Sequence, residues 1–98
     1  MNLKINELLH TKAELNARLA LLPYEGTVEI KESGDGKYLY VRKREGGKLK
    51  STYVGAFNDE LYATLLRYSR EARELRRELR KVEKNLAALG YVDGDLSA

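Results

Sequence analysis

The stretch KYLYVRKREGGKLKSTYVG, residues 37–55, decides the fold because two extended runs meet there at a pair of glycines. In the first run, apolar Leu39 and Val41 alternate with aromatic and charged neighbours. Side chains of a β-strand point to its two faces in turn, so this alternation is typical of a strand with one buried face. Gly46-Gly47 is a frequent sequence for a two-residue hairpin turn. The stretch therefore predicts two antiparallel strands joined by a tight turn.

A third strand is expected just before this hairpin. Val28 and Ile30 alternate with polar residues, and the sequence SGDG, residues 33–36, separates them from the hairpin with a second turn signal. Three runs with this alternation and two short turns form a meander in which each strand pairs with the next. We predict a three-stranded antiparallel meander over residues 26–55, with strands at 27–32, 37–44 and 48–54.

The residues before the meander have the period of an α-helix. Apolar side chains recur at spacings of four and three once Lys12 is counted in the row, namely Met1, Ile5, Leu8, Leu15, Leu19 and Leu22. This spacing places them on one stripe of a helix. Lys12 interrupts the stripe, and we expect its ammonium to reach outward to water. Pro23 ends the predicted helix of residues 2–22, because the residue before a proline avoids the α conformation.

The residues after the meander predict a second, longer helix over 58–89. Asn58 suits the N-cap position, and two acidic residues follow it in the first turn. An unbroken 4-3 spacing then runs along the helix, formed by Leu61, Leu65, Tyr68, Ala72, Leu75, Leu79, Val82, Leu86 and Leu89. Such a spacing is the heptad seam of a coiled-coil helix. Gly90 is a natural helix stop, so residues 90–98 are expected to form a short frayed tail.

Together the elements predict an α+β fold in the order helix, three-stranded antiparallel β-meander, long helix, within a single domain of residues 1–98. The first turns of the long helix are expected to cover the sheet face that carries Leu39 and Val41. Its later turns are expected to pair with the first helix as an antiparallel coiled-coil stalk. The sheet face that carries Tyr38 and Tyr40 then stays open to a partner.

The hairpin concentrates tyrosine and positive charge, with three tyrosines, six lysines or arginines and one acidic residue between positions 37 and 55. Its candidate nucleic-acid-binding residues are Tyr38, Tyr40, Arg42, Arg44, Lys48 and Lys50. Cations meet phosphates and tyrosines stack on bases, so the combination favours a nucleic-acid surface. The alternative is structural, because tyrosine is a good strand former and lysines on sheet edges discourage aggregation.

The long helix carries a second candidate surface. Five cations at 3-4-3-4 spacing form a narrow line nearly opposite the leucine seam, namely Arg70, Arg73, Arg77, Arg80 and Lys84. A line of one charge sign is typical of a phosphate-binding helix. The alternative is a solvated helix face on which Glu71, Glu74 and Glu78 pair with the cations at i,i+3 or i,i+4. The two interpretations are equally open.

Composition restricts the chemistry. The chain has 98 residues, a formal net charge of +3, one histidine and no cysteine. It offers no disulfide, thiol nucleophile or cysteine-based metal site. His10 lies off the apolar stripe, and Asp93 and Asp95 suggest a calcium loop only faintly. We expect no catalytic residue, metal, cofactor or small-molecule substrate. No segment has the pattern of a signal peptide or a membrane span, so a cytoplasmic protein without membrane contact is expected.

The sequence KYLYVRKREGGKLKSTYVGAF, followed by a helix with an acidic start, resembles the β-meander at the N-terminus of some transposases. It is also similar to the arm-type DNA-binding domain of tyrosine integrases, where a three-stranded sheet backed by a helix enters the major groove. It further resembles small uncharacterised bacterial and phage proteins with the same hairpin followed by a basic heptad helix. The resemblance implies a DNA-facing role for Tyr38, Tyr40, Arg42 and Lys50. The chain departs from the enzymes after the meander, where a long helix follows.

Two functions are compatible with these patterns. The first is a small non-enzymatic accessory protein, of mobile-element or phage origin, that binds DNA or RNA through the hairpin and the basic line. The second is a protein-interaction module whose heptad helices bind a second copy of the chain or another protein, without a nucleic-acid role. Affinity for oligonucleotides that falls steeply with salt separates the first from the second.

Overall fold

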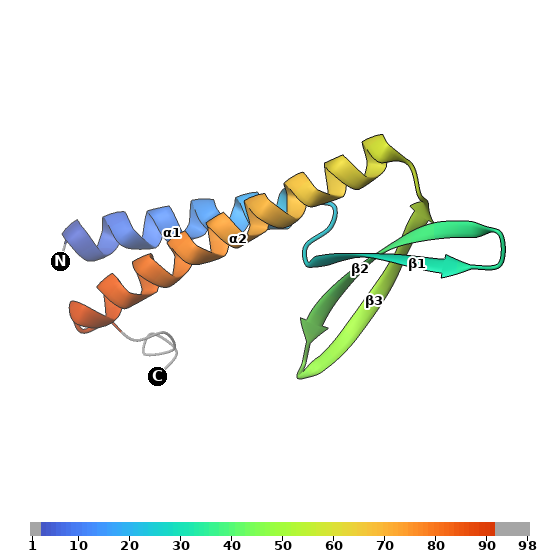
Figure 1. Cartoon of the computed structure of the whole chain (residues 1–98). Coiled ribbons are helices and arrows are strands. Elements are labelled where there is room, and N and C mark those ends of the chain that lie inside the picture. Colours follow the sequence, from blue (N-terminus) through green and yellow to red (C-terminus); the bar gives the residue numbers. More distant parts are fainter. Residues whose placement is uncertain (1–2, 92–98) are drawn as a thin grey trace. The chain divides into compact units, whose positions relative to one another are not determined.

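The computed structural model describes residues 3–91 and confirms the predicted α+β fold (Figure 1). Its elements are α1 (Leu3–Leu21), β1 (Thr27–Ser33), β2 (Gly36–Glu45), β3 (Lys48–Ala56) and α2 (Asp59–Ala88). Helix α1, the three strands and α2 follow one another in the predicted order. The predicted helix start at residue 2, Met1 of the apolar stripe and residues 92–98 of the tail lie outside the described residues.

The chain forms two compact units. The sheet unit consists of Leu22–Arg73 and therefore holds the three strands and the first half of α2. The helical unit combines Met1–Leu21 with Glu74–Ala98, of which residues 3–21 and 74–91 are described. Because α2 contributes to both units, the single domain expected for residues 1–98 stays a prediction.

The sheet has the strand order β1-β2-β3, and both neighbouring pairs are antiparallel, as predicted. Gly46 and Gly47 join β2 to β3 with φ of 56° and 80°. Two positive φ values in a row suit a turn that matches the right-handed twist of the flanking strands, and glycine adopts them without a steric cost. The pairing of β2 with β3 shifts register between Leu39 and Tyr40, which marks a β-bulge in β3.

The core of the sheet unit lies between the sheet and the first turns of α2. Leu39 and Val41 of β2 and Leu65 of α2 are buried and in contact. Partly buried apolar and aromatic residues surround them, namely Tyr24, Val28, Val54, Phe57, Leu61, Tyr62 and Tyr68. This arrangement confirms the expectation that α2 covers the sheet face carrying Leu39 and Val41.

Both ends of α2 are fixed by local signals that the sequence carries. The side-chain oxygen of Asn58 accepts a hydrogen bond from the backbone N–H of Leu61 at 2.8 Å, as an N-cap residue does. At the other end Gly90 has a φ of 85°. The backbone N–H of Tyr91 bonds to the carbonyl of Leu86, and that of Gly90 bonds to the carbonyl of Ala87, each at 3.0 Å. These two bonds form a Schellman motif, which satisfies the last carbonyls of the helix.

In the helical unit, α1 and the second half of α2 run antiparallel to each other (Figure 1). The buried residues of this unit are Leu15, Leu75, Leu79, Val82 and Leu86, which belong to the two predicted apolar stripes. Lys12 Nζ lies 3.9 Å from Glu83 Oε1 of α2, so its ammonium is directed at a carboxylate as well as outward. Regular interlocking of the side chains as a coiled coil stays a prediction.

Candidate nucleic-acid interface

The sheet face that is turned away from α2 is called here the open face. Directly opposed residues of antiparallel strands share a face, so the register assigns its members. They are Thr27, Glu29, Lys31 and Ser33 of β1, Gly36, Tyr38, Tyr40, Arg42 and Arg44 of β2, and Leu49, Ser51, Tyr53 and Ala56 of β3. Four of the six predicted hairpin site residues therefore lie together on one surface.

Three tyrosines form a cluster at the middle of the open face. The ring centroids of Tyr40 and Tyr53 are 5.4 Å apart in an edge-to-face arrangement, and those of Tyr38 and Tyr53 are 6.3 Å apart. Tyr38 and Tyr40 are half-buried, whereas Tyr53 is 54% exposed. Such aromatic pairs stabilise one another by about 0.5–1.5 kcal/mol beyond area burial. The cluster therefore holds its rings in fixed places while leaving that of Tyr53 accessible.

Positive charge surrounds this cluster. Lys31 Nζ lies 4.5 Å from the ring centroid of Tyr40, in cation–π geometry. Arg42 Nη1 lies 3.4 Å from a carboxylate oxygen of Glu29, and the Ser51 hydroxyl donates to the same carboxylate at 3.4 Å. Arg44 donates to the carbonyl of Gly47 in the hairpin turn at 3.1 Å. Within the described strands, the open face thus carries three cations and one carboxylate.

Lys48 and Lys50, the remaining two predicted hairpin residues, lie on the other face of the sheet. Lys50 is opposite Lys43 and Lys48 is opposite Glu45, and these partners alternate with the open-face residues of β2. Lys50 Nζ lies 3.6 Å from a carboxylate oxygen of Glu45. Two more lysines of this face also meet carboxylates, Lys37 with Glu32 at 3.9 Å and Lys43 with Glu25 at 3.4 Å. The hairpin charge therefore divides between two faces, and that of the second face is largely compensated.

The predicted basic line on α2 is called here the basic stripe. Its members Arg70 and Arg73 belong to the sheet unit, and Arg77, Arg80 and Lys84 belong to the helical unit. All five are exposed. Within residues 3–91, no carboxylate oxygen lies within 4.0 Å of these cations. The intrahelical pairs with Glu71, Glu74 and Glu78 that the alternative interpretation expects are therefore not formed here.

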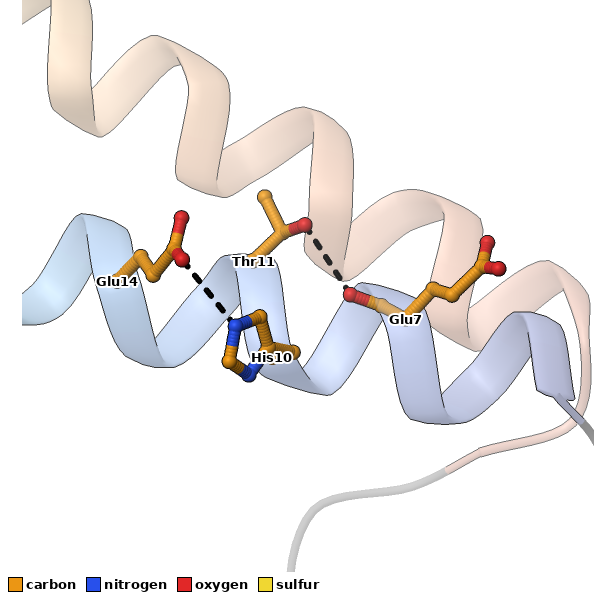
Figure 2. A network of polar contacts seen from close by, with 4 residues as sticks. All are labelled: Glu7, His10, Thr11 and Glu14. Atoms are coloured by element: carbon orange, nitrogen blue, oxygen red, sulfur yellow. Dashed lines mark hydrogen bonds and ion pairs between the residues drawn. The ribbon is translucent and has the colours of Figure 1, made fainter.

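His10 lies on the exposed side of α1, where Figure 2 shows its local contacts. Its Nε2 lies 3.2 Å from Glu14 Oε1, four residues along the helix, and the Thr11 hydroxyl donates to the Glu7 carbonyl at 3.1 Å. The His10 side chain is 77% exposed, so it faces water and not a cavity. Contacts of this kind are ordinary surface pairs of a helix.

Among residues 3–91, no group of three or more histidine, cysteine or acidic side chains is arranged to hold a metal ion. Helices α1 and α2 both lack the length of apolar sequence that spanning a bilayer requires. Asp93 and Asp95, the faint calcium signal, lie outside the described residues.

The fold and the open face define a small α+β protein with an aromatic sheet surface flanked by cations. The chain belongs to the family described as a domain of unknown function (DUF6788), whose model matches residues 4–63. No curated protein and no solved structure matches it. The matched segment contains most of α1, all three strands and the first turn of α2, so the whole open face lies inside it and the basic stripe follows it.

Two open-face residues, Tyr53 and Lys31, were not among the sequence-predicted site residues. A signal for Tyr53 was present, since a two-residue turn at Gly46-Gly47 pairs Glu45 with Lys48 and, by counting outward, Tyr40 with Tyr53. Lys31 required the register of the β1–β2 hairpin as well, which pairs it with Tyr38.

Proposed function

We propose that the protein is a small non-enzymatic accessory protein that binds nucleic acid in the cytoplasm, of the kind that mobile elements and phages encode. The observation that carries the proposal is the open face, which gathers Tyr38, Tyr40 and Tyr53 with three cations on one rigid sheet. The proposal includes the DNA-facing role that the sequence resemblance to transposase N-termini and integrase arm domains implies for Tyr38, Tyr40 and Arg42. Contacts of this kind need no catalytic groups.

The chemistry of binding follows from the two kinds of side chain. Lys31, Arg42 and Arg44 supply positive charge for backbone phosphates, whose neutralisation releases counterions from the nucleic acid. The tyrosine cluster supplies aromatic surface for bases or sugars, as in other sheets that bind nucleic acid. Packing of Leu39 and Val41 against α2 on the far side keeps the sheet in place, so little ordering is needed on binding.

The basic stripe has an auxiliary role in this proposal. Its five exposed cations add phosphate contacts that do not depend on sequence. The family model matches residues 4–63, so it includes the open face but not the basic stripe. We therefore assign the main role in binding to the open face.

The test is the affinity for short labelled oligonucleotides, measured by fluorescence anisotropy at two salt concentrations. Three phosphate contacts by the open face predict that affinity for a single strand falls roughly 20-fold between 50 and 200 mM salt. The double variant Arg42→Gln, Arg44→Gln should weaken binding at the lower salt. A matched double variant, Lys43→Gln with Lys50→Gln, removes the same charge from the other face of the same hairpin and should change little. The absence of binding at low salt, for any oligonucleotide, removes the proposal.

A second candidate function is protein interaction through the helices. One observation favours it: Leu3 and Leu21 of α1 are 74% and 82% exposed, and the stripe residues Ile5, Leu8 and Leu19 are only half-buried. A second copy of the chain or another protein would cover this apolar surface.

Sedimentation of the wild type against Leu9→Glu tests the second function, because Leu9 is half-buried and lies off the main stripe. If the helices assemble, the variant shifts the protein from a dimer to a monomer, whereas Thr11→Glu, at an exposed site on the opposite side of α1 from Leu9, does not. Circular dichroism of both variants controls for folding. A wild type that sediments as a monomer at all concentrations argues against self-assembly.

A further inference from the structure

The three tyrosines of the open face are not equivalent, and the difference points to a ligand class. We infer that the open face binds single-stranded nucleic acid, DNA or RNA, in preference to a duplex, with an unstacked base on the ring of Tyr53. This inference rests on the proposed function and adds the form of the ligand to it.

The three tyrosine rings differ in how much of their surface is accessible. Lys31 Nζ occupies the space over the Tyr40 ring, 4.5 Å from its centroid, so that face of Tyr40 is covered. Tyr38 and Tyr40 are half-buried within the cluster, while Tyr53 is 54% exposed. Tyr53 is therefore the ring of this cluster that offers the largest surface to a base.

The ring of Tyr53 is held in place by its neighbours in the cluster. Tyr40 contacts Tyr53 at an interplanar angle of 64°, and Tyr38 contacts it at 50°, so two neighbouring rings restrict its movement. Tyr53 also immediately precedes the register shift in β3, where the extra residue increases the local twist of the strand. A ring with few free rotamers loses little entropy when a base stacks on it.

A single strand and a duplex expose different parts of their bases to a protein. The bases of a duplex cover one another's faces and expose only their edges, which proteins read with paired hydrogen bonds, most often from arginine. Of the open-face side chains in the described strands, those of Arg42 and Arg44 carry a guanidinium group that could donate paired hydrogen bonds. Arg42 is engaged by Glu29 at 3.4 Å and Arg44 by the Gly47 carbonyl at 3.1 Å. An exposed aromatic ring, by contrast, needs the face of a base, which a single strand provides.

Charge supports the same ligand form. Glu29 lies in β1 on the open face. It is opposite Tyr40 of β2, which in turn is opposite Tyr53 of β3. A sheet inserted into a groove has phosphates on both flanks, so a carboxylate there meets repulsion from two sides. A single strand has one backbone and so meets the Glu29 carboxylate from one side only, while Lys31, Arg42 and Arg44 stay close to it.

The experiment compares labelled oligo-dT, oligo-rU and a duplex of equal length in anisotropy titrations with wild type, Tyr53→Ser and Tyr53→Phe. We expect tighter binding to the single strands, a loss of about tenfold or more in that affinity for Tyr53→Ser, and wild-type affinity for Tyr53→Phe, which keeps the ring. Affinity for the duplex should not change. Thr52→Ala, at an exposed residue of the same strand on the other face of the sheet, is the matched control and should leave all affinities unchanged.

The outcomes are distinguishable. Loss of affinity for oligo-dT, oligo-rU or both on Tyr53→Ser, with rescue by Tyr53→Phe, supports the inference and shows which sugar the face accepts. Duplex binding as tight as single-strand binding, or a Tyr53→Ser variant that weakens all ligands equally or none, overturns the inference and leaves the proposed function standing. If no oligonucleotide binds, both fall. Thermal unfolding followed by circular dichroism confirms that each variant is folded.

Discussion

Glu29 is an acidic residue of the open face, and removing its charge is expected to raise the affinity of this face for nucleic acid. Its carboxylate lies 3.4 Å from Arg42 and accepts a hydrogen bond from Ser51, so it holds an arginine that the proposed function assigns to a phosphate. Binding must therefore either replace this contact or proceed without Arg42. Removing the negative charge should release the arginine and lessen repulsion of the ligand backbone at the same time.

We predict that Glu29→Gln increases the affinity for a single-stranded oligonucleotide by about two- to fivefold at low salt, since exposed charge pairs contribute about 0.2–1 kcal/mol. Anisotropy titrations measure the change. Glu32→Gln is the matched control, because Glu32 is on the same strand, faces the other side and pairs with Lys37. Equal gains from both substitutions would show that overall charge, and not the Arg42 contact, controls binding.

A second position at the residue scale concerns the sheet itself. Gly26, just before β1, has a φ of 138°, and a Cβ atom there would overlap the backbone carbonyl of Arg42. Glycine is therefore required by both conformation and space at this point. The close approach brings the start of β1 against β2 and so aligns Glu29 with the open-face residues of β2.

At the scale of the element, α2 depends on its first hydrogen bonds. Asn58 caps the backbone N–H of Leu61 at 2.8 Å, and Leu61 and Tyr62 pack against the core that supports the sheet. We predict that Asn58→Ala lowers the free energy of unfolding by about 1 kcal/mol, because the capped N–H loses its partner. Urea denaturation followed by circular dichroism measures this change.

The chemistry of the cap gives this prediction its control. Asn58→Asp keeps an acceptor oxygen and adds a negative charge at the positive end of the helix, so it should retain the stability of the wild type. If Asn58→Ala and Asn58→Asp have the same free energy of unfolding, the side-chain cap of α2 does not contribute to the stability of the protein.

The elements could be predicted from the sequence because local signals and burial agree. Alternation of Leu39 and Val41 specified the covered face of β2, and Gly46-Gly47 specified the turn. The strand ends differ by one or two residues, since β2 begins at Gly36 and β3 extends to Ala56. The bulge between them has no local signal in the sequence, because it depends on how β3 continues into α2.

The candidate site was less predictable than the fold for a reason that lies in β3. In this strand the alternation does not mark a buried face, because Leu49 and Tyr53 of the open face are exposed while Lys50 and Thr52 lie on the other side. Residue composition alone therefore grouped Lys48 and Lys50 with the tyrosines, although the register separates them. Counting from the turn would have assigned the faces, because one residue of slippage moves every side chain to the other side.

At the scale of the whole molecule, the chain carries two groups of cations with different surroundings. The open face combines its charge with aromatic rings, whereas the basic stripe of α2 has charge alone. Phosphate contacts position a ligand without reading its bases, so the two groups should differ in what they contribute to binding. The stripe should strengthen binding to every nucleic acid, and the open face should determine which form is preferred.

The last prediction separates the two contributions. The double variant Arg77→Gln, Arg80→Gln removes two exposed stripe cations of the helical unit, where neither side chain is part of the core. We predict that the slope of log affinity against log salt becomes shallower by about 1.4 for a single strand and about 1.8 for a duplex, while the single strand stays the preferred ligand. Lys4→Gln with Arg18→Gln removes the same charge from α1 of the same unit and should change the slope little. A loss of the single-strand preference with the stripe variant would mean that α2, and not the tyrosine cluster, selects the ligand, because charge removed at a site without aromatic rings could then alter recognition of the bases.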